Sequence, residues 1–297
     1  MATEPGGSPA AEDEDNKLKI YLLPNLLTAG NLFCGFLALT KIVEADIHAD
    51  HFNTAIRNAI FFIILACVFD LLDGRVARLG GQDSPFGREF DSLADIISFG
   101  AAPAFLVHRV VLRDVFSSHP EVYPEVGWFL ASIYLICGAF RLARFNCLAA
   151  QPGTGGGGKD FLGFPIPAAA GTVASITLFL LWLDDHRWLD ERFAKTPWRY
   201  ILPFIMVFLS FMMVSQVKYP SFKSLDWRAR RTFPKMIVII LIVGFLLIAG
   251  HMVLPVVLPV IFTAYLIYGF IRPRLSRKIR HEIEQEDDEE EDHPPSQ

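Results

Sequence analysis

The stretch Asp70–Asp95 reads DLLDGRVARLGGQDSPFGREFDSLAD, and the rest of the chain is interpreted outward from it. Asp70 and Asp73 are three residues apart and Asp91 and Asp95 are four apart, so each pair shares one face of a helix. The Gly-Gly-Gln-Asp-Ser-Pro segment between the pairs is typical of a turn. The stretch therefore predicts a helical hairpin that points four carboxylates into one space.

Long apolar runs flank this hairpin on both sides, at residues 59–69 and 96–107. A carboxylate near the centre of a membrane helix costs roughly 2.5–3.5 kcal/mol, and four together repel one another. A divalent cation with oxygen ligands would hold them, and Mg²⁺ or Mn²⁺ suits such ligands better than an ion that prefers thiolates. The pattern predicts a site for two metal ions, with Asp70, Asp73 and Asp91 as ligands and Asp95 at its edge. The alternative is two charged helix ends held by salt bridges.

The spacing D-x2-D-G-x2-A-R-x8-G-x3-D-x3-D resembles the signature of the CDP-alcohol phosphatidyltransferase family. Its fixed positions are met by Asp70, Asp73, Gly74, Ala77, Arg78, Gly87, Asp91 and Asp95. The resemblance implies a metal-dependent transferase that uses a CDP-activated lipid. It implies the same metal ligands and makes Asp95 the general base that accepts the proton of the acceptor's hydroxyl.

Composition places the chain in a membrane. Of its 297 residues 52% are hydrophobic, and the apolar residues are clustered in long runs. We expect an all-α membrane protein, a polytopic bundle of about eight transmembrane helices with a six-helix core. The expected helices span residues 24–44, 56–79, 87–111, 127–149, 163–183, 198–217, 233–252 and 255–271. The last two could instead form one broken helix, which leaves seven crossings.

The chain divides by composition into a core and flanking segments. They are an acidic, disordered N-terminal tail (1–20), the six-helix core (21–217), a basic cytoplasmic loop (218–232), two further transmembrane helices (233–272) and a charged, largely disordered C-terminal tail (273–297). No N-terminal signal peptide is apparent.

Lysine and arginine in the loops predict the orientation. With a cytoplasmic N-terminus, the inside segments hold most of the 27 basic residues. Both termini are then cytoplasmic, and the four aspartates lie at the inner end of the bundle, so the active site opens to the cytosol.

One glycine-rich segment imitates a phosphate-binding loop. Residues 153–159 read GTGGGGK, which fits G-x4-G-K, but Asp160 stands where such a loop needs Ser or Thr. The segment also follows an apolar helix rather than a strand. We interpret it as a flexible connector, and we expect no nucleic-acid partner.

Residues around the signature are candidates for binding the CDP-lipid. By resemblance, the small side chains of Gly74 and Ala77 face the nucleotide, and Asp70, Arg78 and Gly87 belong to the same pocket. Thr28 and Asn31 are further candidate contacts. The alternatives are close helix packing for the small residues and polar packing between helices for Thr28 and Asn31.

Flanking motifs resemble one subgroup, the integral-membrane phosphatidylserine synthases. They are Asp91–Ala104, Pro24-Asn25 with Thr28 and Asn31, RLARFN at 141–146, GFPIP at 163–167 and YPSFK at 219–223; Phe164 stands where Leu is usual. The resemblance implies CDP-diacylglycerol as donor, L-serine as acceptor, surrounding membrane lipid and a homodimer.

Serine needs a cation for its carboxylate and acceptors for its ammonium. Arg141 and Arg144, three residues apart near the end of a helix, could bind a carboxylate, and with Asn146 they are the candidate serine subsite. The alternative is topological anchoring or contact with a lipid phosphate. Two other functions stay open: a sister enzyme that uses glycerol 3-phosphate or inositol, and a cation transporter or channel.

Overall fold

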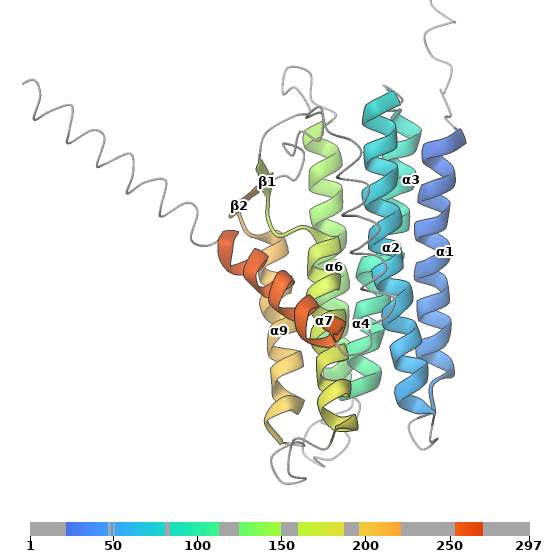
Figure 1. The fold of residues 1–297 in the computed structure, drawn as a ribbon. Helices are drawn as coiled ribbons and strands as arrows, with labels where there is room; N and C mark the ends of the chain where they lie inside the picture. The colour runs from blue at the N-terminus through green and yellow to red at the C-terminus, as the bar shows by residue number, and fades with distance from the viewer. Residues whose placement is uncertain are drawn as a thin grey trace, which may run out of the picture.

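A computed structural model describes residues 22–46, 49, 51–80, 84–112, 125–149, 160–186, 196–220 and 253–269. These residues form a helical bundle with its long helices side by side (Figure 1). The helical elements of the described ranges are α1 (Leu22–Glu44), α2 (Phe52–Gly80), α3 (Pro85–Asp95), η1 (Ile96–Ala101), α4 (Ala102–Val107), η2 (His108–Leu112), α6 (Glu125–Ala149), α7 (Ile166–Asp185), α9 (Thr196–Val214) and the helix Val253–Gly269.

The bundle confirms the all-α membrane fold. Within the described ranges, seven of the eight expected helices are present, and five helices are long and apolar enough to cross a membrane. Residues 201–214 and 253–269 form shorter apolar helices. The protein is therefore an integral membrane protein. The expected helix 233–252, both tails, the glycine-rich segment and most of the basic loop lie outside the described residues.

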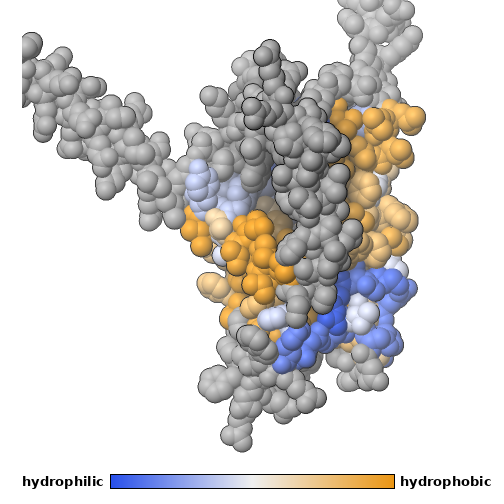
Figure 2. Space-filling view, viewed as in Figure 1, coloured by the Kyte–Doolittle hydropathy of each residue, from blue (hydrophilic) through white to orange (hydrophobic). Residues whose placement is uncertain are grey.

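Apolar side chains cover much of the outside of the bundle. On α1, Leu26, Phe33 and Phe36 are each about 60% exposed, which is the pattern of a helix that faces lipid. In Figure 2 the coloured residues form large apolar patches along the side of the bundle, and hydrophilic residues gather at the end where α1 connects to α2.

α1 packs tightly against the polypeptide that follows Asp95. Gly35 is buried, and a Cβ atom built on it would lie 2.7 Å from the Cα of Ser98 in η1, so only glycine fits there. The Ser98 hydroxyl donates a hydrogen bond to the backbone oxygen of Asn31 at 3.0 Å. This close approach sets α1 beside the two acidic helices.

The third helix begins as its residues require. Ser84 caps α3, its hydroxyl oxygen accepting a hydrogen bond from the Gly87 N–H at 3.0 Å, and Pro85 occupies the first turn. From Asp95 the helix continues through η1, which has π-helical geometry, into α4. The sequence predicted the length of this helix but not its π-helical turns.

A tyrosine supports the π-helical segment. Pro103 has no N–H with which to bond the carbonyl four residues before it, that of Phe99. The hydroxyl of Tyr134, fully buried on α6, donates to that carbonyl oxygen at 3.2 Å. The proline and the tyrosine therefore stabilise the altered helix that follows Asp95.

Two three-residue strands, which the sequence analysis did not predict, join the ends of α7 and α9. β1 (Asp160–Leu162) pairs antiparallel with β2 (Lys218–Pro220). Gly163 follows β1 with φ +81°, in the left-handed region that favours glycine, and its N–H donates to Val217 O at 2.9 Å. These backbone bonds replace helical ones, so α7 begins at Ile166 and α9 ends at Val214, each three residues short of the expected bounds.

Candidate active site

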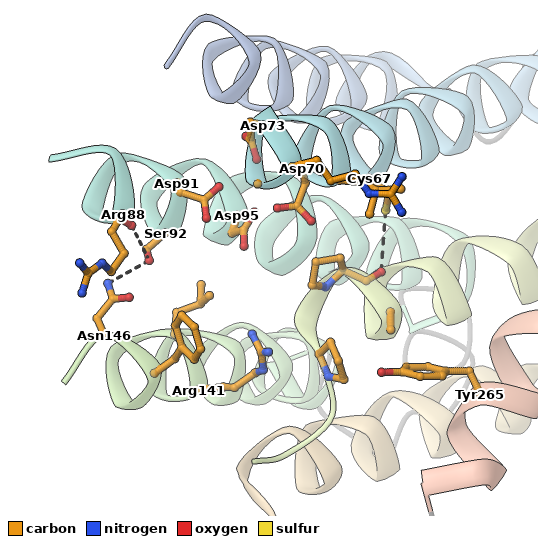
Figure 3. A pocket seen from close by; sticks show the side chains of 18 of the residues that line it. Cys67, Asp70, Asp73, Arg88, Asp91, Ser92, Asp95, Arg141, Asn146 and Tyr265 are labelled. Atoms are coloured by element: carbon orange, nitrogen blue, oxygen red, sulfur yellow. Dashed lines mark hydrogen bonds between the residues drawn. The ribbon is translucent and has the colours of Figure 1, made fainter. Parts of the chain in front are cut away.

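A cavity of about 560 Å³ opens between α2, α3, α6, α7 and the helix Val253–Gly269 (Figure 3). Its lining comprises Cys67, Asp70, Leu71, Asp73, Gly74, Arg75, Arg88, Asp91, Ser92, Asp95, Arg141, Leu142, Phe145, Asn146, Pro165, Pro167, Ala168, Ile261, Phe262 and Tyr265. All four aspartates of the central stretch are in this lining, as the hairpin prediction requires.

Three of the aspartates form a compact group. Asp70, Asp91 and Asp95 each offer one carboxylate oxygen, and these three atoms lie within 4.8 Å of one another. Asp91 Oδ1 is buried and has no hydrogen-bond partner among the described residues. An unpartnered buried oxygen within a set of hard oxygen donors fits a divalent cation such as Mg²⁺ or Mn²⁺. The group could therefore hold a metal ion.

Asp73 lies in the same cavity but is held differently. Its side chain is 4% exposed, and its Oδ2 accepts a hydrogen bond from the Thr28 hydroxyl of α1 at 3.0 Å. It stands outside the group of three carboxylates, although the sequence pattern ranked it with the ligands and placed Asp95 at the edge. Asp73 still lines the cavity beside these three carboxylates, and its contact with Thr28 ties it to α1.

Asn31 of α1 holds Asp95. Its side-chain N–H donates to Asp95 Oδ1 at 3.1 Å, and Asp95 is 6% exposed while Asn31 is fully buried. Neither Asn31 nor Thr28 lines the cavity, although both were predicted to contact the nucleotide. Both instead contact aspartates from behind, a role that the sequence analysis missed because it depends on the packing of α1.

Only two of the three residues predicted to bind the acceptor line the cavity. Arg141 and Asn146 line the cavity, whereas Arg144 does not, and its Nη1 donates to Val214 O of α9 at 3.4 Å. Arg141 Nε and Asn146 Oδ1 are buried atoms with no hydrogen-bond partner within the described part of the chain. The amide N–H of Asn146 donates to Ser92 Oγ at 2.9 Å.

The small residues of the signature differ in whether they line the cavity. Gly74 lines the cavity, and Ala77 and Gly87 do not. A Cβ atom on Gly87 would lie 3.2 Å from Ser84 Oγ, so this glycine allows the tight first turn of α3. The side chain of Arg78 lies outside the described residues.

Comparison with known proteins agrees with this arrangement. The family model of CDP-alcohol phosphatidyltransferases matches residues 21–212, a segment that contains the whole acidic hairpin and its partners on α1 and α6. The chain belongs to this family.

Relatives within the family carry more specific names. The chain is 34% identical over 253 residues to a CDP-diacylglycerol–serine O-phosphatidyltransferase of Helicobacter pylori, covering 85% of this chain and 91% of the relative. It is 32% identical to an archaetidylserine synthase of Methanothermobacter thermautotrophicus (69% and 73%). It is also 32% identical to the CDP-diacylglycerol–serine O-phosphatidyltransferase of Bacillus subtilis (68% and 91%).

The sequence analysis did not identify several of the residues that line the cavity. Arg75 and Arg88 lie within the central stretch, but their charge was used only to orient the helices. Cys67 lies one helical turn before Asp70, and its thiol lies 3.8 Å from Pro167 O. Tyr265 comes from an apolar helix far along the chain, where no motif marks it.

Proposed function

We propose that this protein is a phosphatidylserine synthase, which transfers the phosphatidyl group of CDP-diacylglycerol to L-serine and releases CMP. The observation that carries the proposal is the group of three carboxylates facing Arg141 and Asn146 across one cavity, in a chain of this family. The names of the relatives from H. pylori and B. subtilis support serine as the acceptor.

The donor would bind at the acidic end of the cavity. Asp70, Asp91 and Asp95 would hold Mg²⁺ or Mn²⁺, with Asp73 beside them, and two ions suit the four carboxylates. A divalent cation supplies charge neutralisation for the diphosphate oxygens. Gly74 leaves room on the cavity face of α2 for the cytidine. Ala77, Arg78 and Gly87 lie outside the described lining, and only the family signature supports a role for them at the nucleotide.

Asp95 would act as the general base. The Asn31 bond to its Oδ1 fixes the carboxylate, which would accept the proton of the serine hydroxyl. The serine oxygen then forms a bond to the lipid-side phosphorus, the bond from that phosphorus to the bridging oxygen breaks, and CMP leaves with the electron pair. The protein contributes position and charge, and forms no covalent bond to the lipid.

The acceptor would lie against α6. The guanidinium of Arg141 would bind the serine carboxylate, and the unpartnered Asn146 Oδ1 would accept a hydrogen bond from the ammonium. Arg144 is not part of this subsite, because it bonds to the end of α9.

The charges of the loops support an orientation of the protein in the membrane. We propose from these charges that both termini and the mouth of the cavity are cytoplasmic. The family match supports the further proposals that residues 21–217 are the catalytic core and that the protein is a homodimer. A cysteine placed in the C-terminal tail, labelled by an impermeant maleimide only after the cells are opened, would support the orientation; labelling of intact cells would refute it.

CMP release by the purified protein tests the function. With CDP-diacylglycerol and Mg²⁺ or Mn²⁺, we expect release with L-serine and not with glycerol 3-phosphate or inositol. Release with another alcohol only would overturn the acceptor assignment, and no metal-dependent release with any acceptor would favour a transporter.

One variant tests the base. Asp95→Asn should abolish turnover while CDP-diacylglycerol still binds, whereas Asp184→Asn, an exposed carboxylate at the far end of α7, should leave turnover unchanged. Turnover by the Asp95 variant within tenfold of the original would exclude Asp95 as the base.

A further inference from the structure

The helix Val253–Gly269 lies beyond the segment that matches the family model and yet forms one wall of the cavity. The match ends at residue 212, whereas Ile261, Phe262 and Tyr265 line the same space as the aspartates. Figure 1 shows this helix (red) running obliquely to the others, and Figure 3 shows Tyr265 on the opposite side of the cavity from the acidic residues, with its hydroxyl directed inward.

Two glycines hold this helix at the cavity. A Cβ atom on Gly171 of α7 would lie 2.2 Å from the ring of Phe262, and one on Gly269 would lie 1.8 Å from the ring of Tyr219 in β2. The rings of Tyr219 and Tyr265 also pack together, with centroids 5.9 Å apart. Since each contact requires the absence of a side chain, the sequence specifies this docked position.

The two sides of the cavity differ in chemistry. Every charged residue of the lining comes from α2, α3 or α6, and the described lining from the Val253–Gly269 helix has none. Pro165 and Pro167 continue the uncharged side from the start of α7. Apart from the Tyr265 hydroxyl, the side chains of this wall offer no partner to the ammonium and carboxylate of an amino acid, whereas their apolar surface matches a hydrocarbon.

Ile261 connects the cavity to the outer surface. It lines the cavity and is 56% exposed, and its neighbour Val260 is 63% exposed but does not line the cavity. The apolar wall therefore reaches an exposed apolar face of the helix, which in a membrane would contact lipid. A two-chain lipid whose diphosphate lies at the carboxylates would pass its glycerol and first methylenes along this wall.

We propose that the helix Val253–Gly269 is the lipid-side wall of the donor site, and that Ile261, Phe262 and Tyr265 position the diacylglycerol part of the CDP-activated lipid. The inference rests on the proposed function and adds specificity residues from outside the family core. Ile261 is a suitable test position because its exposure makes its truncation inexpensive for the fold.

Two neighbouring substitutions separate this role from general damage to the helix. Ile261→Ala removes three carbons that would contact the lipid, and we expect the KM for CDP-diacylglycerol to rise about five- to tenfold with the KM for serine unchanged. The matched variant Val260→Ala should leave both constants within twofold. Equal effects of the two substitutions, or a rise in the KM for serine only, would overturn the proposal.

A second measurement does not depend on turnover. CDP-diacylglycerol with a diazirine near the glycerol end of one acyl chain is bound to the full chain in detergent, irradiated and mapped by mass spectrometry. We expect adducts within residues 253–269 that excess unlabelled CDP-diacylglycerol prevents. Adducts found only outside residues 253–269, or adducts that the unlabelled lipid does not reduce, would refute the assignment of this helix to the lipid-binding wall. Competed adducts without serine-dependent CMP release would support the wall and refute serine as acceptor.

Discussion

Replacing Asn31 with alanine should lower the turnover number about 10- to 100-fold while leaving the KM for CDP-diacylglycerol nearly unchanged. Asn31 donates to Asp95 Oδ1 at 3.1 Å from a fully buried position. A hydrogen bond to a charged group contributes about 1.5–3 kcal/mol. Because each 1.36 kcal/mol in the barrier is a factor of about ten, loss of this bond during proton transfer gives the stated range.

The expected split between the two kinetic constants follows from where Asn31 lies. It contacts Asp95 from behind and does not line the cavity, so the bound lipid keeps its contacts while the base loses its orientation. Initial rates of CMP release at varied CDP-diacylglycerol and saturating serine measure both constants. Thermal unfolding in the same detergent shows whether the fold is retained.

Two further variants sharpen the Asn31 test. Asn31→Asp places a second carboxylate against Asp95 and should lower turnover further than alanine does. Thr40→Val, on the exposed side of the same helix, removes a bond to Phe36 O and should change neither constant. A loss in turnover below threefold for Asn31→Ala, or a rise in KM with turnover unchanged, would refute the positioning role.

The other predictions concern the fold and the metal. Tyr134→Phe leaves the buried Phe99 carbonyl without its side-chain partner and should lower the free energy of unfolding by about 1–3 kcal/mol; an unchanged unfolding midpoint would show that this bond contributes nothing. Gly171→Ala forces the ring of Phe262 to move and should cost about 1–3 kcal/mol in the same measurement, and a variant as stable as the original would show that the helix yields easily. Chelation with EDTA should abolish CMP release, and Mg²⁺ or Mn²⁺ should restore it; activity that survives chelation would exclude a metal at the carboxylates.

The helices and the acidic hairpin were predictable because their signals are local. Apolar runs of membrane length predicted seven helices that the described residues contain, and Ser84 with Pro85 marked the start of α3. The spacing of the aspartates placed each pair on one helix face, and all four line one cavity. A periodic pattern is enough for these results, since each depends on residues within a turn or two of one another.

The local signals failed where backbone bonds formed between distant segments. The bounds of α7 and α9 were wrong by three residues because Gly163 bonds to the chain after α9, and the β1–β2 pair joins segments far apart in the sequence. The π-helical turn η1 after Asp95 accepts a hydrogen bond from Tyr134 of another helix, a contact that no local pattern indicates.

The sequence by itself determined an integral membrane helical bundle of a known family, with a carboxylate cluster at one end of it. Only the tertiary structure decided that Asp70, Asp91 and Asp95 form the most compact group of carboxylates, that Asn31 donates to Asp95, and that Arg144 donates to the end of α9. It also decided that Tyr265 reaches the cavity. The physical reason is that periodicity sets which residues share a helix face, whereas the rotation and close approach of packed helices set which faces meet.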